Sequence, residues 1–295
     1  MFNFTLDEVS LMKKVQFTGE RFVGFVDLGS QSKLIYNEEN MEDIPVMATH
    51  CLMFALVGIN CNLKVPIAYY LIEALNGEAK SILVKNALTK LSENKINVRS
   101  ISFDGISSNI TMCEFLGAKM QRLSIDKVVT FFKHLVTGEI VYLYLDPSHM
   151  LKLLRNVFAN KGIIIDGLSN KVINYKYMLR IIKLQNAIGL RYGNKLKKRH
   201  IYFNNEKMRT PLAAQLLSSS SAAKLRCLEK TEPLNIMFQG AEATALYCEN
   251  LNNIFDLLNS RSFFNKSKSK LPISIKNFET IKTNCEKYIL YIFLF

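Results

Sequence analysis

Short apolar runs separated by polar turns dominate the first part of the chain and predict a strand-rich region. Residues 2–17, 21–28, 47–59 and 65–72 are each expected to be extended, because they alternate or run apolar over strand length. Thr18-Gly19-Glu20 is typical of the hairpin turn that would join the first two segments. The chain is therefore expected to open with a set of antiparallel strands.

Helices and buried strands alternate after this region, and residues 29–45 are polar and acidic, as expected of a loop. In chain order the pattern predicts a helix over 78–92, a strand over 98–103, a helix over 109–116, a strand over 139–145 and a helix over 148–159. The last helix has a favourable start at Asp146-Pro147. Its apolar spacing predicts that one set of side chains faces inward, Leu151, Leu154 and Val157, and that Lys152 and Arg155 face outward.

The remainder of the chain is basic and mostly helical. Helices are expected over 173–190, 210–228 and 233–259. A cationic cluster lies between the first two helices, and it is either a solvated face or a surface for phosphates; its charged members are Lys195, Lys197, Lys198 and Arg199. Beyond Arg261 the 266–270 stretch is linker-like, and the final apolar run, 288–295, begins no recognisable element.

The order of strands, helix and strand predicts the opening half of an RNase H-like sheet. In that arrangement the first strand and the strand over 98–103 are parallel neighbours. Asp7 and Asp104 would then face one another across adjacent strands and could share a divalent cation.

Asp104 has two interpretations at this stage. It follows a buried strand directly, and the carboxyl ends of strands in open α/β sheets are where ligands and chemistry are found. It also precedes a helix, and Asp is a common helix cap. The pattern alone does not decide between a metal ligand and a cap.

The charge balance points to a polyanionic partner. Among 295 residues, 38 are basic and 25 acidic, which gives a formal net charge of +13. Such an excess favours nucleic acid first and an anionic membrane second, with a merely soluble basic protein as the alternative. The six cysteines have no zinc-like spacing, so reduced buried thiols are expected. No signal peptide and no membrane span are expected, because the sequence has no basic leader before an apolar core and no apolar run of about 20 residues.

Several stretches, taken in order, resemble the blocks of a known family. They are 4–10, 24–29, 64–70, 103–105 with 108–109, 146–156, 195–200, 212–218 and 255–261. Each block alone is weak, but their order over residues 2–262 makes the match specific. On these residues the chain resembles the P-element-type DNA transposase family, which includes the THAP-domain transposase relatives.

The resemblance implies an α/β fold, an RNase H-like mixed sheet with a mostly helical insertion domain that binds GTP. It assigns the catalytic and Mg²⁺-binding acids to Asp7 and Asp104, with Asp27 ranked below Asp7. It also assigns nucleotide contacts in the insertion, at Lys183, Ser218, Phe255 and Asp256. An Asp at a helix end can accept two hydrogen bonds from guanine, and Lys183 could meet phosphate.

The chain departs from the family in two places. Where a relative has Asn-Lys-x-Asp, this chain has Asn174-Tyr175-Lys176-Tyr177, so that stretch does not support guanine specificity. The family's third acid, a Glu after the insertion, has no counterpart, because Glu279 and Glu286 lie in a tail that resembles nothing in the family. Two-metal phosphoryl transfer needs enough carboxylates for both ions. The expectation is therefore a chain that binds DNA without cutting it.

The resulting prediction has three parts: an RNase H-like part over 1–145, a GTP-binding-type insertion over 146–262 and a divergent or truncated tail over 263–295. The THAP module and the acidic C-terminal helix are expected to be missing. The parent activity would be Mg²⁺-dependent DNA cleavage and strand transfer in the nucleus. The expected partner is transposon DNA. The chain could also form a homo-oligomer, and no membrane partner is expected. The alternatives are a catalytically dead DNA- or nucleotide-binding remnant and an unrelated basic α/β protein.

Overall fold

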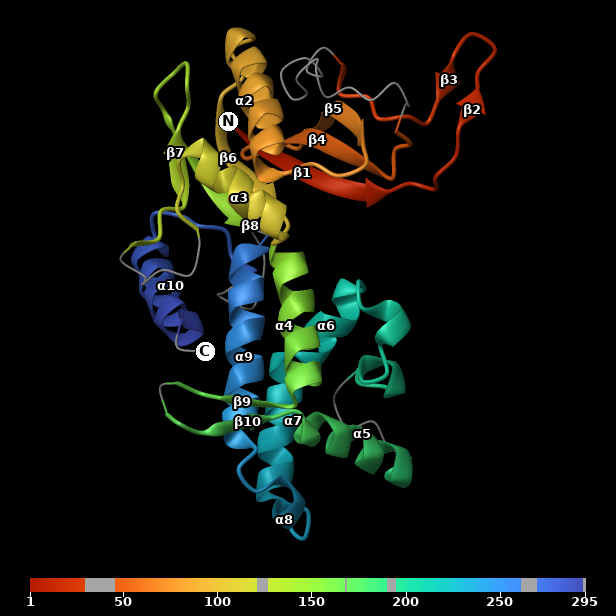
Figure 1. The fold of residues 1–295 in the computed structure, drawn as a ribbon. Coiled ribbons are helices and arrows are strands. Elements are labelled where there is room, and N and C mark those ends of the chain that lie inside the picture. Colours follow the sequence, from red (N-terminus) through yellow and green to blue (C-terminus); the bar gives the residue numbers. More distant parts are fainter. Residues whose placement is uncertain (30–45, 121–126, 168, 190–194, 261–269, 294–295) are drawn as a thin grey trace. The chain divides into compact units, whose positions relative to one another are not determined.

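The computed structural model describes residues 1–29, 46–120, 127–167, 169–189, 195–260 and 270–293. It divides into two compact units, Met1–Asp146 and Pro147–Phe295 (Figure 1). Each unit has its own hydrophobic core, so each is described by itself. Among the described residues, no helix is both long enough and apolar enough to cross a membrane.

A six-stranded mixed sheet forms the centre of the first unit. Its strand order is β5-β4-β1-β6-β8-β7. The strands are β1 (Phe2–Ser10), β4 (His50–Gly58), β5 (Lys64–Ile72), β6 (Val98–Phe103), β7 (Phe131–Lys133) and β8 (Ile140–Leu145). β1 pairs with β4 antiparallel and with β6 parallel, and β6 pairs with β8 parallel. The predicted RNase H-like arrangement, with β1 and β6 as parallel neighbours, is confirmed.

Two helices, α2 (Gly77–Glu93) and α3 (Ser107–Leu116), pack on one face of this sheet (Figure 1). Alternation along β1 buries Phe4 and Leu6 in the core, while Asn3 and Thr5 belong to the other face. Hydrogen bonds join Asn3 to Ser102 and to Ser100 of β6 across that second face. The sheet therefore has one apolar, helix-covered face and one more polar face.

Gly77 allows the two helices to approach closely where α2 begins. A Cβ atom at this position would lie 2.6 Å from both the backbone nitrogen of Met112 and the Cβ of Thr111. Asn76 caps α2, since its side-chain oxygen accepts a hydrogen bond from the Ala79 N–H at 2.8 Å. The first turn of α2 is thus fixed against α3.

The early part of the chain differs from the prediction in detail. The predicted hairpin is confirmed, because β2 (Gln16–Phe17) and β3 (Phe22–Val23) pair antiparallel. The strand expected over 21–28 is limited to β3, and its later residues make only isolated bridges, Phe25 with Met47 and Asp27 with Leu71. Most of the loop expected over 29–45 lies outside the described residues.

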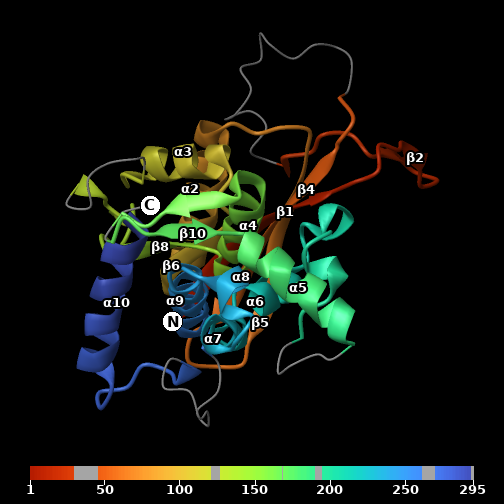
Figure 2. The same cartoon turned by 90° about the horizontal axis from the view of Figure 1, so that it is seen from below.

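The second unit is mostly helical, with one small hairpin (Figure 1 and Figure 2). Its elements are α4 (Pro147–Lys161), β9 (Ile163–Ile165), β10 (Val172–Asn174), α5 (Lys176–Ile188), α6 (Thr210–Leu216), α7 (Ser219–Lys230), α8 (Asn235–Phe238), α9 (Glu242–Leu258) and α10 (Phe278–Phe293). Short 3-10 helices occur at Lys198–His200 and Asn204–Glu206. In both views α7 lies alongside α9.

Each of the three helices predicted for this region is shorter or divided in the structure. The first begins three residues late, because Val172–Asn174 pairs with β9 instead. The second is broken before Ser218, whose side chain caps α7. The third is broken at Gln239–Gly240–Ala241, where Gly240 has φ +79° and separates α8 from α9. Periodicity continues through each break, so it did not reveal them.

The chain's final stretch also corrects the prediction. The apolar run over 288–295 was expected to begin no element, but its first residues form the end of α10. Ile281 and Tyr291 of this helix are buried, at 8 % and 4 % exposure. An amphipathic helix explains the run, because one apolar face is covered.

The predicted orientation of α4 is wrong for its two cations. Arg155 is 0 % exposed and Lys152 is 7 % exposed, whereas Val157, predicted inward, is 49 % exposed. The Arg155 guanidinium lies 3.9 Å from the centre of the Phe203 ring. Its Nη2 donates to the Lys207 carbonyl at 2.6 Å, and its Nε donates to the Asn156 side chain at 2.9 Å. The segment after Lys198 covers this face of α4, so a charged side chain becomes part of the core.

Arg155→Met should destabilise the second unit by roughly 2–4 kcal/mol, because it removes a desolvated cation–π contact and leaves the Lys207 carbonyl without its donor. Lys161→Met on the same helix is the control, since Lys161 is exposed and should change stability by less than about 0.5 kcal/mol. Urea unfolding followed by circular dichroism measures both. If the two variants unfold alike, Arg155 does not hold this segment.

Candidate functional site

Asp7, in β1, and Asp104, directly after β6, belong to neighbouring parallel strands of the first unit. The pairing runs from Phe2 with Val98 to Thr5 with Ser102. Continuing it by two residues sets Asp7 beside Asp104, on strands about 4.8 Å apart. Alternation assigns both residues to the more polar face of the sheet, the face on which Asn3 contacts Ser102.

The surroundings of the two carboxylates differ. Asp7 is exposed, and its Oδ1 accepts a hydrogen bond from the Glu8 N–H at 2.9 Å. Asp104 is half-buried, and its Oδ1 accepts from the Asn109 side-chain amide at 2.5 Å. The N-cap of α3 is Ile106, without a side-chain cap bond, and the Ile106 N–H is 3.4 Å from Asp104 Oδ1. The interpretation of Asp104 as the helix cap is therefore wrong.

A buried lysine near this edge was not found from the sequence. Lys80 of α2 is 2 % exposed and forms an ion pair with Glu8. Its ammonium also donates to the Ser108 hydroxyl at 2.8 Å and to the Asn109 side-chain oxygen at 2.9 Å. Lys80 lies three and four residues before the buried Leu83 and Val84, so helical periodicity places it on the apolar face of α2 despite its charge. A cation in the first turn of a helix is unfavourable for the helix dipole, and that was a second signal.

The two Asp carboxylates suit a hard divalent cation. Carboxylate oxygens are the ligands that Mg²⁺ prefers, and Mg²⁺ commonly keeps several waters when one or two carboxylates bind it. Among the described residues, no group of three or more His, Cys, Asp or Glu side chains could hold a metal ion. The edge therefore fits one cation with two protein ligands better than a fully protein-bound pair.

In the second unit, three of the four predicted nucleotide residues lie toward one end of α9. Phe255 and Asp256 are at its carboxyl end, and Ser218 caps the start of α7, which runs antiparallel beside α9. Arg226, further along α7, pairs with Glu242 and Glu249. This pairing sets the capping end of α7 toward the carboxyl half of α9.

Lys183 lies on another helix, α5. This helix is anchored at the other end of α9: Asn174 N–H donates to the Thr244 hydroxyl at 2.9 Å, and Tyr177 donates to the Gln239 carbonyl at 2.5 Å. Twelve residues of helix, about 18 Å, separate Thr244 from Asp256. Lys183 is exposed on α5.

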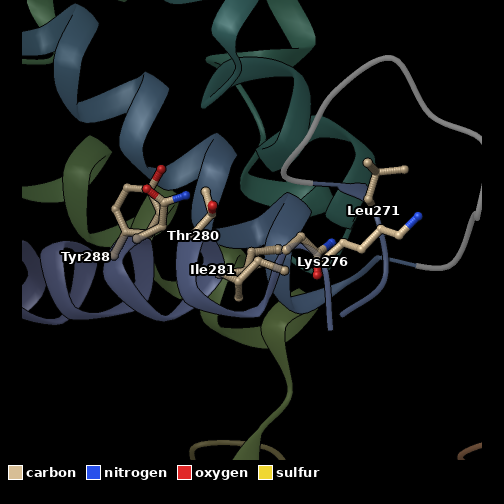
Figure 3. Close-up of a pocket in the computed structure, with 8 residues that line it drawn as sticks. Leu271, Lys276, Thr280, Ile281 and Tyr288 are labelled. Carbon is tan, nitrogen blue, oxygen red and sulfur yellow. The ribbon is translucent and has the colours of Figure 1, made fainter. Parts of the chain in front are cut away.

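Asp256 lies beside a groove at the carboxyl end of α9. Its side chain accepts from Asn252 at 2.9 Å and pairs with Lys270 at 3.4 Å. The groove is about 330 Å³ and is lined by Leu257, Leu271, Lys276, Asn277, Thr280, Ile281, Asn284 and Tyr288. Figure 3 shows that Thr280, Ile281 and Tyr288 of α10 form one side of it. Its size and mixed lining are within the range of small-ligand sites.

The stretch that departs from the family has a structural role. Asn174 ends β10, and its side-chain oxygen accepts from the Lys176 N–H at 2.9 Å. Tyr175 and Tyr177 are buried in the core of the second unit, and burial raises the pKa of Tyr175 to about 12. The stretch therefore forms the junction between β10 and α5.

The predicted cationic cluster lies at the surface of the second unit. Lys195, Lys197 and Lys198 are exposed, beside a groove of about 450 Å³ that begins on α5. Arg199 forms an ion pair with Glu206, which raises the pKa of Arg199 and lowers that of Glu206. Residues 266–269 lie outside the described part of the chain.

Two family models match the chain in succession. The model described as "TNP-like, RNase H N-terminal domain" matches residues 1–117, and the model described as "TNP-like, GTP-binding insertion domain" matches residues 148–272. The chain is also 24 % identical over 243 residues to the human DNA transposase THAP9. The aligned region covers 82 % of the chain and 25 % of THAP9.

A second relative and a solved structure agree with this result. The transposable element P transposase of Drosophila melanogaster is 28 % identical over 141 residues, covering 47 % of the chain and 18 % of that protein. The fold resembles that in the Drosophila P element transposase strand transfer complex, with a TM-score of 0.74 and 19 % identity over 97 % of the chain and 57 % of the solved one.

The chain spans about a quarter or less of the two curated relatives it matches. The two models nevertheless follow one another in the order of the two structural units and together cover most of the sequence. The sheet order, the helical second unit and the relatives agree with them. The chain belongs to the P-element-type DNA transposase family.

Proposed function

We propose that Asp7 and Asp104 are metal-binding acids of a transposase core whose parent activity is Mg²⁺-dependent DNA cleavage and strand transfer. The observation that supports this most strongly is the parallel pairing of β1 with β6, which brings both acids to one edge and one face of the sheet. Because the chain matches part of each relative, the activity of a whole transposase is part of this proposal.

Each acid has a distinct part in the proposed chemistry. A bound Mg²⁺ would supply Lewis-acid polarisation of a phosphodiester and a more acidic bound water. Asp7 is exposed and can approach a metal from the open side of the edge. Asp104 has one oxygen committed to Asn109, so its second oxygen is the one available to a cation.

The 295-residue chain by itself is proposed to bind DNA without cutting it. Two carboxylates hold one cation, whereas in-line displacement at a two-metal site needs ligands for two ions roughly 3.5–4 Å apart. DNA binding would use the cationic surface of the second unit, with phosphate contacts that carry no sequence information. Action on transposon DNA implies a nuclear location, which belongs to the same proposal.

The second unit is proposed to bind a purine nucleotide, with GTP as the first candidate. The match to a GTP-binding insertion domain supports this, together with the position of Asp256 beside the groove of Figure 3. Asp256 would accept hydrogen bonds from the base, with Phe255 and Ser218 close to it. Lys183 would contact phosphate only if the nucleotide extends along α9 toward α5.

A non-catalytic role is the second candidate function. In that case the chain is a DNA- or nucleotide-binding remnant of a transposase. The observation that favours it is the absence, among the described residues, of any cluster of three metal-ligating side chains. Metal binding and cleavage, measured separately, distinguish the two functions.

Mn²⁺, followed by electron paramagnetic resonance, should bind the wild-type chain at one weak site. Asp7→Ala and Asp104→Ala should each reduce its affinity by about tenfold or more, because each removes one of two charged ligands. Glu93→Ala is the matched control: Glu93 is an exposed acid of the same unit at the carboxyl end of α2, close to the start of β6 and away from its end. Unchanged binding in both test variants would remove these acids from the metal site.

DNA affinity should fall steeply as the salt concentration rises. In a plot of the logarithm of affinity against the logarithm of salt concentration, each neutralised phosphate should contribute a slope of about −0.9. Replacing Lys195, Lys197 and Lys198 with Gln should weaken binding and flatten this slope by about 2–3. A charge-matched control replaces Lys13, Lys14 and Lys64, which are exposed in the first unit. Gel shifts at several salt concentrations measure both variants. An equal loss in both would mean that only net charge matters.

The same samples should show no nicking in Mg²⁺ or Mn²⁺. Nicking that is lost in Asp104→Ala would demonstrate a complete active site in this chain, and the non-cutting proposal would then be wrong.

Calorimetry should detect weak binding of GTP that Asp256→Ala abolishes, since that carboxylate would accept hydrogen bonds from the base. Lys183→Ala should have a smaller effect, because its helix is anchored at the other end of α9. Glu286→Ala, an exposed acid of α10, is the control. Equal affinity of wild type and Asp256→Ala would exclude Asp256 from the nucleotide site.

A further inference from the structure

A chain of polar contacts runs from β1 through the two helices to Asp104. It begins at Glu8, passes through the Lys80 ammonium and the Asn109 amide, and ends at Asp104 Oδ1. The two central side chains are almost completely buried, with Lys80 2 % and Asn109 3 % exposed. These contacts connect four elements of the first unit, β1, α2, α3 and β6.

The chemistry of the donors fixes the orientation of Asn109. An ammonium group can only donate hydrogen bonds, so the side-chain oxygen of Asn109 must face Lys80. The amide nitrogen of Asn109 must then face Asp104, where it donates at 2.5 Å. A carboxylate can only accept, so Asp104 favours the same orientation of the amide. Lys80 reinforces that orientation by donating to the Asn109 oxygen, and it holds the side chain in place on the side away from Asp104.

The buried charge of Lys80 is compensated by Glu8. A buried ammonium is costly unless it is paired and hydrogen-bonded, and Lys80 has both an anion and two neutral acceptors. Glu8 follows Asp7 directly in β1 and belongs to the opposite face of the strand. The same lysine thus restrains the strand that carries Asp7 and the amide that holds Asp104.

The placement of Lys80 opposes helix stability. It lies in the first turn of α2, where the helix dipole disfavours a cation. Gly77, whose lack of a Cβ allows α2 to approach α3, brings that turn within reach of Ser108 and Asn109. A role beyond helix formation accounts for a cation at this position.

We propose that Lys80 and Asn109 are positioning residues of the candidate metal site, which hold Asp104 with one oxygen engaged and the other directed to a cation. This inference rests on the proposed role of Asp104 as a metal ligand. Neither residue touches the metal. They act as the hydrogen-bonding partners that orient metal-binding carboxylates in proteins generally.

Lys80→Met and Asn109→Leu test the proposal, because both keep similar side-chain volume and remove the polar contact. Each should lower Mn²⁺ affinity by about 10- to 100-fold, the usual cost of losing an orienting partner. The double variant should lose little more than either single one, since both act through the same contact to Asp104. Lys90→Met is the matched control: it makes the same replacement at an exposed cation of the same helix and should leave Mn²⁺ affinity unchanged.

A metal-free measurement separates this inference from the proposed function. The side-chain amide protons of Asn109 should exchange slowly with solvent in the wild type and much faster in Lys80→Met, as measured by nuclear magnetic resonance. Unchanged exchange would overturn the positioning role even if Asp104 binds metal. If Asp104→Ala binds Mn²⁺ as the wild type does, the proposed function fails instead. Folded Asn109→Leu with wild-type Mn²⁺ affinity would also overturn the inference.

Discussion

The parallel pairing of β1 with β6 is the constraint on which the candidate site depends. These strands are far apart in the sequence, and only their adjacency brings Asp7 and Asp104 to one edge. The pairing is supported from both sides, by the apolar core under α2 and α3 and by the Asn3–Ser102 contact on the other face. A shift of one residue would move one of the acids to the opposite face of the sheet. The strand register therefore determines both the packing of the sheet and the positions of the two candidate acids.

Most of the sheet could be predicted from the sequence, because each strand is short, apolar and bounded by turn residues. The strand over 98–103 was located to the residue. The helical unit was harder, since its helices are interrupted by features with no periodic signal. The three-residue strand β10 lies where the first predicted helix was expected to begin. A serine cap divides the second predicted helix, and a glycine with positive φ divides the third.

Of the candidate site, only the two carboxylates were predicted from the sequence. Asp104 follows from a strand end, which is visible in a single sequence, whereas Asp7 lies inside β1 and was predicted from the expected strand order and the family resemblance. Lys80 and Arg155 were missed because amphipathic helices normally direct cations to solvent, and only tertiary contacts show that Glu8 and Phe203 receive them inside. Both cations lie at helical spacing from buried apolar residues, Lys80 from Leu83 and Arg155 from Leu151, so their inward position was indicated by spacing and contradicted by charge.

The burial of Lys80, Lys152 and Arg155 changes what the basic composition means. These three cations are counted in the formal charge, yet their side chains are buried, and Lys80 and Arg155 are bound by groups in the interior. A polyanion approaching the surface is attracted by fewer positive charges than the sequence contains. Basic residues in this chain thus fall into two groups: some are buried and contribute to packing, and others are exposed and available for binding. Comparing relatives by total charge alone would merge the two and misjudge their strength as nucleic-acid binders.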